Sequence, residues 1–460
     1  MLSGILEDFR RHIRRQFTAV HFLWHRICGC YSMSLEFLFC KEQQKERHII
    51  KKGVDENMTK QMNECLIVEG ARTATGNFQG GLKDVKAYDL GAACIKEIMV
   101  RTGAPADAVD EVIFGNQFQA GNNANPARWA ALHGGLPESV PSFTPMKNCG
   151  TGLKAIILGA QSLQCGDNEL VISGGMESMT RCPYYLMDAR KGYRMGHGST
   201  VRDGLFEDGL LDPVVQGHMG ITAENLAKRY QISRQEQDEF AFQSHQKAAA
   251  AWEKGIYTDD IASVEIPMRG GKTAIFNQDE TFRSNLTLEE LSSLRPAFMK
   301  DGTVTPGNAS PLNDGAGAVM LATPKRAQEL GLTPIVRYVA SASVGYDPKE
   351  MGAAPIFAVR KLLQKTGLTA NDIGVWELNE AFAVQALTCI KELGLNMDLV
   401  NVNGGAVALG HATGSTGARI SITLMKEMRR RGCKYGIVSL CIGGGQGIAA
   451  LFELCEWKGR

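Results

Sequence analysis

The phrase TGAPADAV at residues 102–109 returns as TGLTANDI at residues 366–373. Each phrase follows a stretch with helical periodicity and leads into a short apolar run, Glu111–Phe114 after the first and Val375–Leu378 after the second. After each run the same order of helices and strands is expected, and each series ends in consecutive glycines. Short phrases of this kind also arise by chance, but the matching order of several elements predicts a duplicated half-domain.

From Cys65 onward, apolar stretches of strand length alternate with stretches of helical periodicity, which predicts an α/β protein with a covered sheet. Thr180–Lys300 breaks this rhythm with two helices of its own, and we interpret it as an insertion or lid that closes the first half. The expected helices of the first half are 85–102, 125–133 and 152–164, and its expected strands are 65–69, 111–114, 142–146, 169–173 and 316–321. The expected domains are an N-terminal extension at 1–61, an N-terminal domain at 62–330 with the insertion at about 180–300, and a C-terminal domain at 331–460.

Composition narrows the function classes. The 460 residues carry 50 basic and 49 acidic side chains, so there is no overall basic field for nucleic acid. No uncharged apolar run reaches the ~18 residues of a membrane-spanning helix. Twelve irregularly spaced cysteines are too few for a disulfide scaffold, which predicts free thiols in a reducing compartment.

Residues 1–61 differ from the rest of the chain. Arg10–Arg15 lies among apolar residues at helical spacing, as in a transit peptide, but Glu7 and Asp8 weaken that interpretation. The alternative that we favour is an upstream start codon, with Met58 or Met62 opening the domain. We therefore expect a cytoplasmic protein, with organellar import as the outcome if the extension is a transit peptide.

One glycine-rich segment places a thiol at the start of a helix. In KNCGTGL, residues 147–153, Cys149 lies where an expected strand meets an expected helix. The positive end of the helix dipole would lower the pKa of the thiol, and the neighbouring glycines would leave N–H groups free for an oxyanion. The alternative is a buried cysteine packed as a small apolar side chain.

Two further segments carry a histidine and a second thiol. NVNGGAVALGHATG, residues 401–414, holds His411 between glycine turns before a long helix, which suits a general base or an N–H donor to an oxyanion. SLCIGGGQG, residues 439–447, brings Cys441 to the end of a strand. A dinucleotide-binding loop is excluded there, because the G-x-G-x-x-G spacing is absent and only thirteen residues follow.

Other motifs are absent from the sequence. There is no C-x-x-C or H-E-x-x-H pattern, so no zinc site is expected. There is no G-x-S-x-G pattern, which removes the usual serine-hydrolase elbow.

Together with GNAS at 307–310 and NEAF at 379–382, these three segments resemble the thiolase family of acetyl-CoA acetyltransferases and 3-ketoacyl-CoA thiolases. The resemblance runs from about residue 62 to the C-terminus. It implies the thiolase fold, in which duplicated halves form five α-β-α-β-α layers and carry an inserted loop domain. It also implies an acyltransferase of lipid metabolism that catalyses reversible Claisen condensation and thiolysis, with acetyl transfer on short chains as the expected activity.

The resemblance assigns catalytic roles residue by residue. Cys149 would be the nucleophile that takes the acyl group, and His411 would activate it. Cys441 would be the acid or base at the α-carbon of acetyl-CoA. Asn379 would hold a water that forms one oxyanion hole with His411, and the backbone amides of Cys149 and Gly443 would form the other.

The resemblance also implies substrate contacts and partners. His218 and Met219 would lie near the acyl group, and Arg283, Phe298 and Ser310 would contact coenzyme A. The implied small molecules are acetyl-CoA, acyl-CoA and CoA, with no metal or other cofactor. The implied assembly is a homodimer or homotetramer.

The sequence departs from the usual family pattern at Thr151, at Ala412 and Thr413 after the histidine, and at Pro306. These changes leave every reacting group in place but leave the acyl chain length open. Two alternatives remain. A decarboxylating ketoacyl synthase would lack a second cysteine, so Cys441 argues against it. A non-catalytic CoA-binding scaffold would be free to lose the reactive residues, all of which are present.

Overall fold

The computed structural model describes residues 62–196, 200–268 and 270–456. The expectations about residues 1–61, the transit peptide and the start codon, lie outside the described residues. No helix in the described part of the chain combines the length and apolar character needed to cross a membrane.

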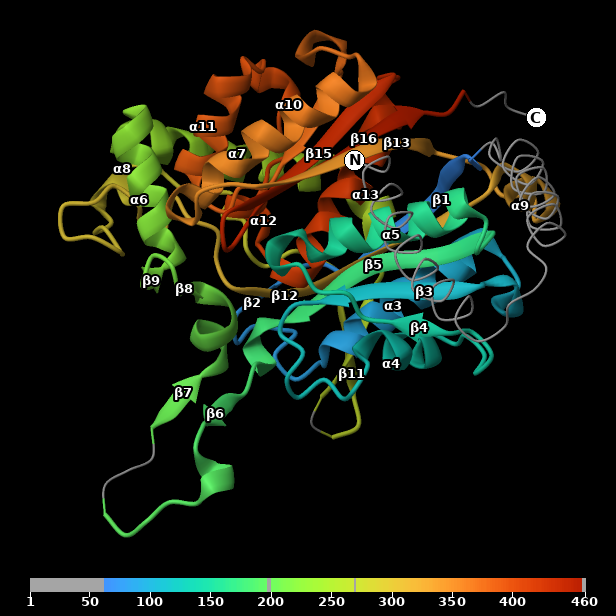
Figure 1. The fold of residues 1–460 in the computed structure, drawn as a ribbon, viewed down its shortest axis with the longest axis horizontal. Helices are drawn as coiled ribbons and strands as arrows, with labels where there is room; N and C mark the ends of the chain where they lie inside the picture. The colour runs from blue at the N-terminus through green and yellow to red at the C-terminus, as the bar shows by residue number, and fades with distance from the viewer. Residues whose placement is uncertain (1–61, 197–199, 269, 457–460) are drawn as a thin grey trace, which may run out of the picture. The chain divides into compact units, whose positions relative to one another are not determined.

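The two halves of the chain contribute strands in the same order to one sheet (Figure 1). In each half a parallel pair is followed by antiparallel neighbours, and an antiparallel pairing of Cys65 with Tyr338 joins the halves. This repeated topology confirms the predicted duplication. The first half runs β4 (Ser142–Phe143), β3 (Glu111–Asn116), β5 (Leu170–Ser178), β12 (Asn313–Ala322) and β1 (Cys65–Arg72), with β2 (Gly76–Asn77) on β12. The second half runs β13 (Val336–Gly345), β16 (Gln446–Leu454), β15 (Tyr435–Ile442) and β14 (Val375–Leu378).

Helices cover both faces of the sheet and fill the space between the halves, giving the five expected layers (Figure 1). The central layer is α5 (Thr151–Cys165) and α13 (Thr413–Arg431), whose apolar side chains share one core with strands of both halves. The outer layers are α3 (Ala87–Thr102) with α4 (Pro126–His133), and α10 (Ala354–Thr366) with α11 (Ala383–Leu393). The two halves also contain the short helices α9 (Pro324–Glu329) and α12 (Ala406–Leu409).

The insertion after β5 packs against the second half as well as the first. Ala223 and Leu226 belong to the apolar core of the second half, and the Ser244 hydroxyl donates to Glu380 Oε2 at 2.8 Å. The insertion therefore also contacts the second half, in addition to the first half that it was expected to close. The insertion contains α6 (Met219–Tyr230), α7 (Arg234–Glu253), α8 (Leu288–Ser293) and the strand pairs β6 (Tyr184–Leu186) with β7 (Val201–Asp203), β8 (Leu211–Asp212) with β9 (Gly217–His218), and β10 (Val264–Pro267) with β11 (Thr273–Phe276).

All five strands expected in the first half differ in length from the structure, and β5 and β4 differ for a clear physical reason. β5 continues through Gly174 and Gly175 to Ser178. Residue 175 is a glycine because a Cβ there would collide with the Gly414 carbonyl at the start of α13. The glycines therefore mark a close crossing of chain segments within the strand. The strand expected at 142–146 pairs only at Ser142 and Phe143, since Pro145 offers no N–H to a neighbour.

Candidate active site

A tight turn presents Cys149 two residues before the first residue of α5. The Gly150 N–H donates to the Lys147 carbonyl at 3.0 Å, and the Lys147 N–H donates to Thr151 Oγ1 at 2.7 Å. Asn148 has a left-handed backbone, with φ of 45°, which asparagine tolerates better than most residues. The turn therefore aims Cys149 away from the core, and its side chain is partly exposed.

His411 stands two residues before the first residue of α13. Its N–H donates to Asn313 Oδ1 at 2.9 Å, and its Nδ1 lies 2.8 Å from Thr416 Oγ1. Because the Thr416 hydroxyl donates its own proton to the Ala412 carbonyl, Oγ1 accepts from Nδ1–H. The hydrogen-bond network thus assigns the tautomer in which Nε2 has a free lone pair, as a general base requires.

One cavity of about 360 Å³ brings together seven of the ten predicted site residues. They are Cys149, His411, Gly443, His218, Met219, Phe298 and Ser310. Its walls include apolar side chains that the sequence analysis did not single out, among them Phe118, Met179 and Leu312. These three also belong to one small apolar cluster, so they form a continuous apolar part of the cavity wall.

Cys441 and Asn379 lie behind the cavity wall. Cys441 is fully buried in the core of the second half, close enough to Cys149 for the two thiols to interact electrostatically. The Asn379 Nδ2 group lies 3.5 Å from His411 Nε2, and the residue is 1% exposed. Both residues therefore border the two groups that the cavity contains.

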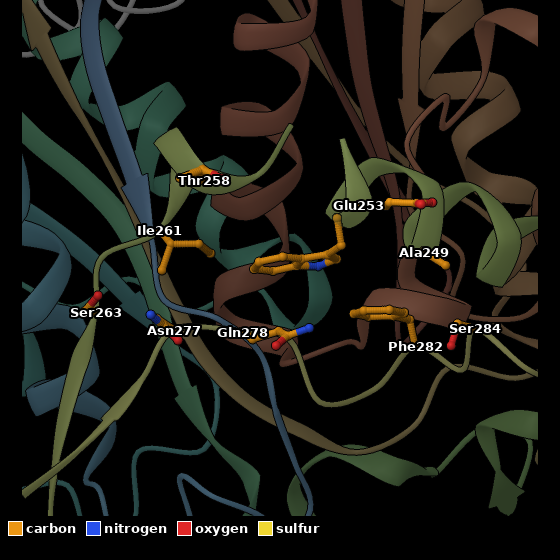
Figure 2. A pocket seen from close by; sticks show the side chains of 10 residues that line it. Ala249, Glu253, Thr258, Ile261, Ser263, Asn277, Gln278, Phe282 and Ser284 are labelled. Atoms are coloured by element: carbon orange, nitrogen blue, oxygen red, sulfur yellow. The ribbon is translucent and has the colours of Figure 1, made fainter. Parts of the chain in front are cut away.

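Arg283 lies outside this cavity on an exposed segment. Its neighbours Phe282 and Ser284 line a separate cavity of about 640 Å³ beside α7, where Figure 2 shows them with Asn277 and Gln278. That larger cavity contains none of the predicted site residues. Of the residues predicted to take part in catalysis, Cys149, His411 and Gly443 meet in the smaller cavity.

The β15–β16 turn faces the nucleophile from the second half. Gly443 begins the turn, and Asn148 Nδ2 donates to its carbonyl at 3.1 Å. The methyl end of Met219 approaches the same glycine, since a Cβ there would lie 2.7 Å from it. The backbone N–H groups of Gly443 and of Cys149 itself lie near the Cys149 sulfur and act to lower the pKa of its thiol.

The expectation of a lowered pKa at Cys149 is wrong. Burial of the sulfur raises the pKa of the Cys149 thiol to about 11, and the negative charge of Glu177 adds to this. The two backbone N–H groups oppose the shift without overcoming it. The thiol is therefore protonated at neutral pH.

The histidine and the second thiol are also neutral. Burial, together with the positive charge of Arg419, lowers the pKa of His411 to about 3. Burial raises the pKa of Cys441 well above its usual value. A thiolate or imidazolium is costly here, so the proton must leave Cys149 while negative charge moves onto a bound carbonyl group.

His218 is held by two aromatic rings and a backbone donor. It stacks on Phe298 at 4.5 Å between ring centroids and meets Phe206 edge-on at 5.9 Å. The Gly220 N–H donates to His218 Nδ1 at 3.0 Å, so the ring proton is on Nε2. Burial lowers the pKa of His218, which makes it a neutral hydrogen-bond donor at the cavity wall.

Sequence reasoning missed Glu177, a buried carboxylate at the end of β5. Five donors reach it at distances from 2.6 to 3.2 Å: Asn116 Nδ2, the Gln117, Phe118 and Gly414 N–H groups, and the Thr413 hydroxyl. These donors come from the cavity wall and from the start of α13. The only signal in the sequence was a glutamate directly after an apolar glycine-containing strand.

No group of three or more His, Cys, Asp or Glu side chains that could hold a metal ion occurs among residues 62–196, 200–268 and 270–456.

A duplicated five-layer α/β fold with two thiols and a histidine at the junction of its halves defines an acyl-transfer enzyme of the thiolase class. Family models described as "Thiolase, N-terminal domain" and "Thiolase, C-terminal domain" match residues 65–325 and 332–454. The chain belongs to the thiolase family, so it is an acyltransferase that catalyses Claisen condensation and thiolysis.

Two relatives show how close the similarity is. An acetyl-CoA acetyltransferase of Pseudomonas aeruginosa is 50% identical over 388 residues, which are 84% of this chain and 98% of that protein. The crystal structure of the Bacillus anthracis acetyl-CoA acetyltransferase matches with a TM-score of 0.84 at 43% identity, covering 86% of this chain and all of that one.

Proposed function

We propose that this chain is a short-chain acetyl-CoA C-acetyltransferase that works through an acyl-enzyme on Cys149. The observation that carries the proposal is the meeting of Cys149 and His411 in one cavity. The names of the relatives in Pseudomonas aeruginosa and Bacillus anthracis support acetyl-CoA as the substrate.

In thiolysis, Cys149 Sγ attacks the 3-keto carbon of the substrate while His411 Nε2 takes the thiol proton. The bond between C2 and C3 breaks, and the departing acetyl-CoA carbanion takes a proton from Cys441. The Cys441 thiolate then takes the proton of the CoA thiol as the CoA sulfur attacks the acyl-enzyme, and Cys149 leaves with the proton held by His411. This step releases acyl-CoA and restores Cys149, His411 and Cys441. In condensation the same steps run in reverse. Two thiols are needed because one cannot be acylated and act as the base in the same turnover.

Two sets of donors suit the oxyanions of these steps. The backbone amides of Cys149 and Gly443 would stabilise the tetrahedral intermediates on Cys149. Asn379 and His411 would stabilise the enolate of acetyl-CoA, Asn379 acting through a water. Removing one oxyanion-hole donor typically lowers the rate by ~10²–10³.

The same proposal covers substrate binding. His218 and Met219 would contact the acyl group, and Phe298 and Ser310 the pantetheine end. Arg283 would contact the phosphates of coenzyme A from outside the cavity, where a charged group remains in water. The apolar side chains of Phe118 and Leu312 in the lining of this cavity of about 360 Å³ support a short acyl group as its occupant.

Assembly is a further part of the proposal, with a second copy of the chain as partner. The arm that contains β6 and β7 extends from the rest of the fold (Figure 1). It exposes Tyr184, Leu186 and Val201 to 66%, 50% and 58%. Apolar side chains gathered on one projecting segment are typical of an interface. Sedimentation of the full chain tests this, with a dimer or tetramer expected. The domain boundaries and cytoplasmic localisation remain predictions.

The activity is tested by thiolysis of acetoacetyl-CoA with free CoA, with mass spectrometry of the enzyme after mixing with acetyl-CoA. An acetyl group on Cys149 and turnover of acetoacetyl-CoA are expected. Activity that requires a malonyl thioester would favour a decarboxylating ketoacyl synthase. Tight CoA binding with no acyl-enzyme would favour a non-catalytic scaffold.

A further inference from the structure

The turn between β15 and β16 carries the Gly443 amide, on which the second oxyanion hole depends. Gly443, Gly444 and Gly445 form this turn, and the last two have φ angles of 84° and 74°. Glycine loses more conformational freedom on folding than any other residue. The position of the Gly443 amide in the oxyanion hole therefore depends on the contacts that hold this turn in place.

The second half holds the far side of the turn through its own backbone. The Tyr346 N–H donates to the Gly445 carbonyl at 2.6 Å. A Cβ on Gly445 would lie 2.6 Å from Pro348 N, so the two segments are in close contact. These contacts fix Gly445, which lies two residues beyond the amide that faces Cys149.

The first half holds the near side through the two residues that precede the nucleophile. Asn148 Nδ2 donates to the Gly443 carbonyl at 3.1 Å. Lys147 Nζ donates to Gln446 Oε1 at 2.8 Å, and Gln446 is the first residue of β16. The loop that contains Cys149 thus forms a hydrogen bond to the glycine turn at each end, at Gly443 and at Gln446.

We propose that Asn148 and Lys147 are positioning residues that fix the Gly443 amide relative to the Cys149 sulfur across the junction of the two halves. This inference deepens the proposed function and rests on it. Oxyanion donors act at about 2.7–3.1 Å from the oxygen, and a working site holds its groups to within ~0.5 Å. Release of the turn would exceed that tolerance without removing any reacting atom.

The inference separates two reactions of the same thiol. Acyl transfer to Cys149 places negative charge on a carbonyl oxygen and needs the Gly443 amide. Alkylation of Cys149 by iodoacetamide displaces iodide from carbon and forms no oxyanion. Loss of these contacts should slow the first reaction and spare the second when the alkylation rate is expressed per thiolate, because the Gly443 N–H also lowers the pKa of the Cys149 thiol.

The test uses the full chain with two variants and a control. Asn148→Gly keeps the left-handed backbone but removes the donor to Gly443. The double variant Lys147→Met with Gln446→Leu removes the second bond without touching the residue beside Cys149. Lys154→Met on α5 is the matched control, since Lys154 is a nearby lysine whose charge lowers the pKa of Lys147.

For acetoacetyl-CoA thiolysis we expect kcat to fall ~10- to 100-fold in both variants, below the ~10²–10³ for complete loss of a donor. KM and the alkylation rate per thiolate should stay within about twofold of wild type, and Lys154→Met should leave all three within about twofold. Wild-type kcat in both variants would overturn the inference, as would an alkylation rate per thiolate that falls together with kcat. If Asn148→Gly does not fold, the double variant decides by the same criteria. Failure of the proposed function is distinct, because wild type itself would then form no acyl-Cys149.

Discussion

Cys149 and His411 occupy equivalent places in the two halves, each two residues before the first residue of a central helix, Thr151 of α5 and Thr413 of α13. The two helices share one apolar core, and both residues open into one cavity. The duplication therefore supplies one reactive group from each half. The positive ends of both helix dipoles lie where acyl transfer places negative charge.

Substitution of Cys149 tests the nucleophile. Cys149→Ala should lower kcat for acetoacetyl-CoA thiolysis by at least ~10³, because no other partly exposed thiol lines the described cavity and general acid–base help cannot replace a covalent step. Mass spectrometry after mixing with acetyl-CoA should show no acetylated protein. Full turnover by this variant would show that another group takes the acyl chain. Cys165→Ala, at an exposed cysteine outside the cavity, is the control and should behave as wild type.

Substitution of Cys441 should separate the two half-reactions. Cys441→Ala keeps Cys149 and both amides of the second oxyanion hole, so acetyl transfer from acetyl-CoA to Cys149 should continue. Condensation should fall by ~10²–10⁴, the usual contribution of a positioned acid or base. Single-turnover acetylation and steady-state condensation measure the two effects. A parallel loss of both would assign Cys441 to the structure of the core instead. Cys389→Ala removes a neighbouring buried thiol and controls for packing.

Glu177 predicts a dependence of stability on pH. Burial raises the pKa of its carboxyl from 4.5 to about 7, against the effect of its five donors. The folded protein therefore binds a proton more tightly than the unfolded chain between pH 4.5 and 7. The contribution of this group to the free energy of unfolding is largest below pH 4.5 and falls as pH rises to about 7, by up to ~3 kcal/mol.

The measurement is denaturant unfolding of wild type and Glu177→Gln at several pH values from 5 to 8. The titratable groups that face Glu177 are Cys149 and Cys182, whose own pKa values are raised to about 11 and 12, so they stay neutral across this range. The free energy of unfolding of wild type should fall relative to that of Glu177→Gln as pH rises. A difference that is constant with pH would exclude titration of Glu177 in this range.

The fold could be predicted from the sequence because its signals are local. Repeated phrases, helix-ending glycines and apolar runs gave the order of elements and their duplication. β5 extends beyond the strand that the sequence predicts, because consecutive glycines are typical of a strand end. Only the packed structure shows that the Gly414 carbonyl crosses at Gly175. Contacts between segments more than two hundred residues apart leave no periodic pattern to detect.

The site could be predicted where backbone and chemistry coincide in one segment. Cys149, His411 and Gly443 stand in glycine-rich loops at the ends of elements, so their residue types already indicate their place. Glu177 was missed because its five donors come from two segments far from it along the chain, residues 116–118 and 413–414. The pKa of Cys149 was predicted in the wrong direction, since helix position is visible in sequence but the burial that outweighs it is not.

The crossing at Gly175 predicts a large effect from one methyl group. In Gly175→Ala the new Cβ meets the backbone of Gly414, three residues after His411, and backbone cannot move aside cheaply. The melting temperature should fall, with a loss of roughly 1–3 kcal/mol or more as in other overpacked cores. Activity of the folded fraction should fall as well, because His411 lies two residues before the first residue of α13. Gly345→Ala is the control, since nothing lies within 4 Å of its Cβ position. Equal stability of the two variants would contradict the crossing.

The apolar wall of the cavity predicts how chain length can be changed. Leu312 lines the cavity and packs on the cluster of Phe118 and Met179, and it is only partly buried, so its truncation should leave the fold intact. Leu312→Ala makes room for about two more methylene groups, each worth ~0.8 kcal/mol on burial. The ratio of kcat/KM for 3-ketohexanoyl-CoA to that for acetoacetyl-CoA should therefore rise roughly tenfold. Val100→Ala, on the exposed face of α3, should leave the ratio unchanged. An unchanged ratio in Leu312→Ala would place the acyl chain against another wall of the cavity.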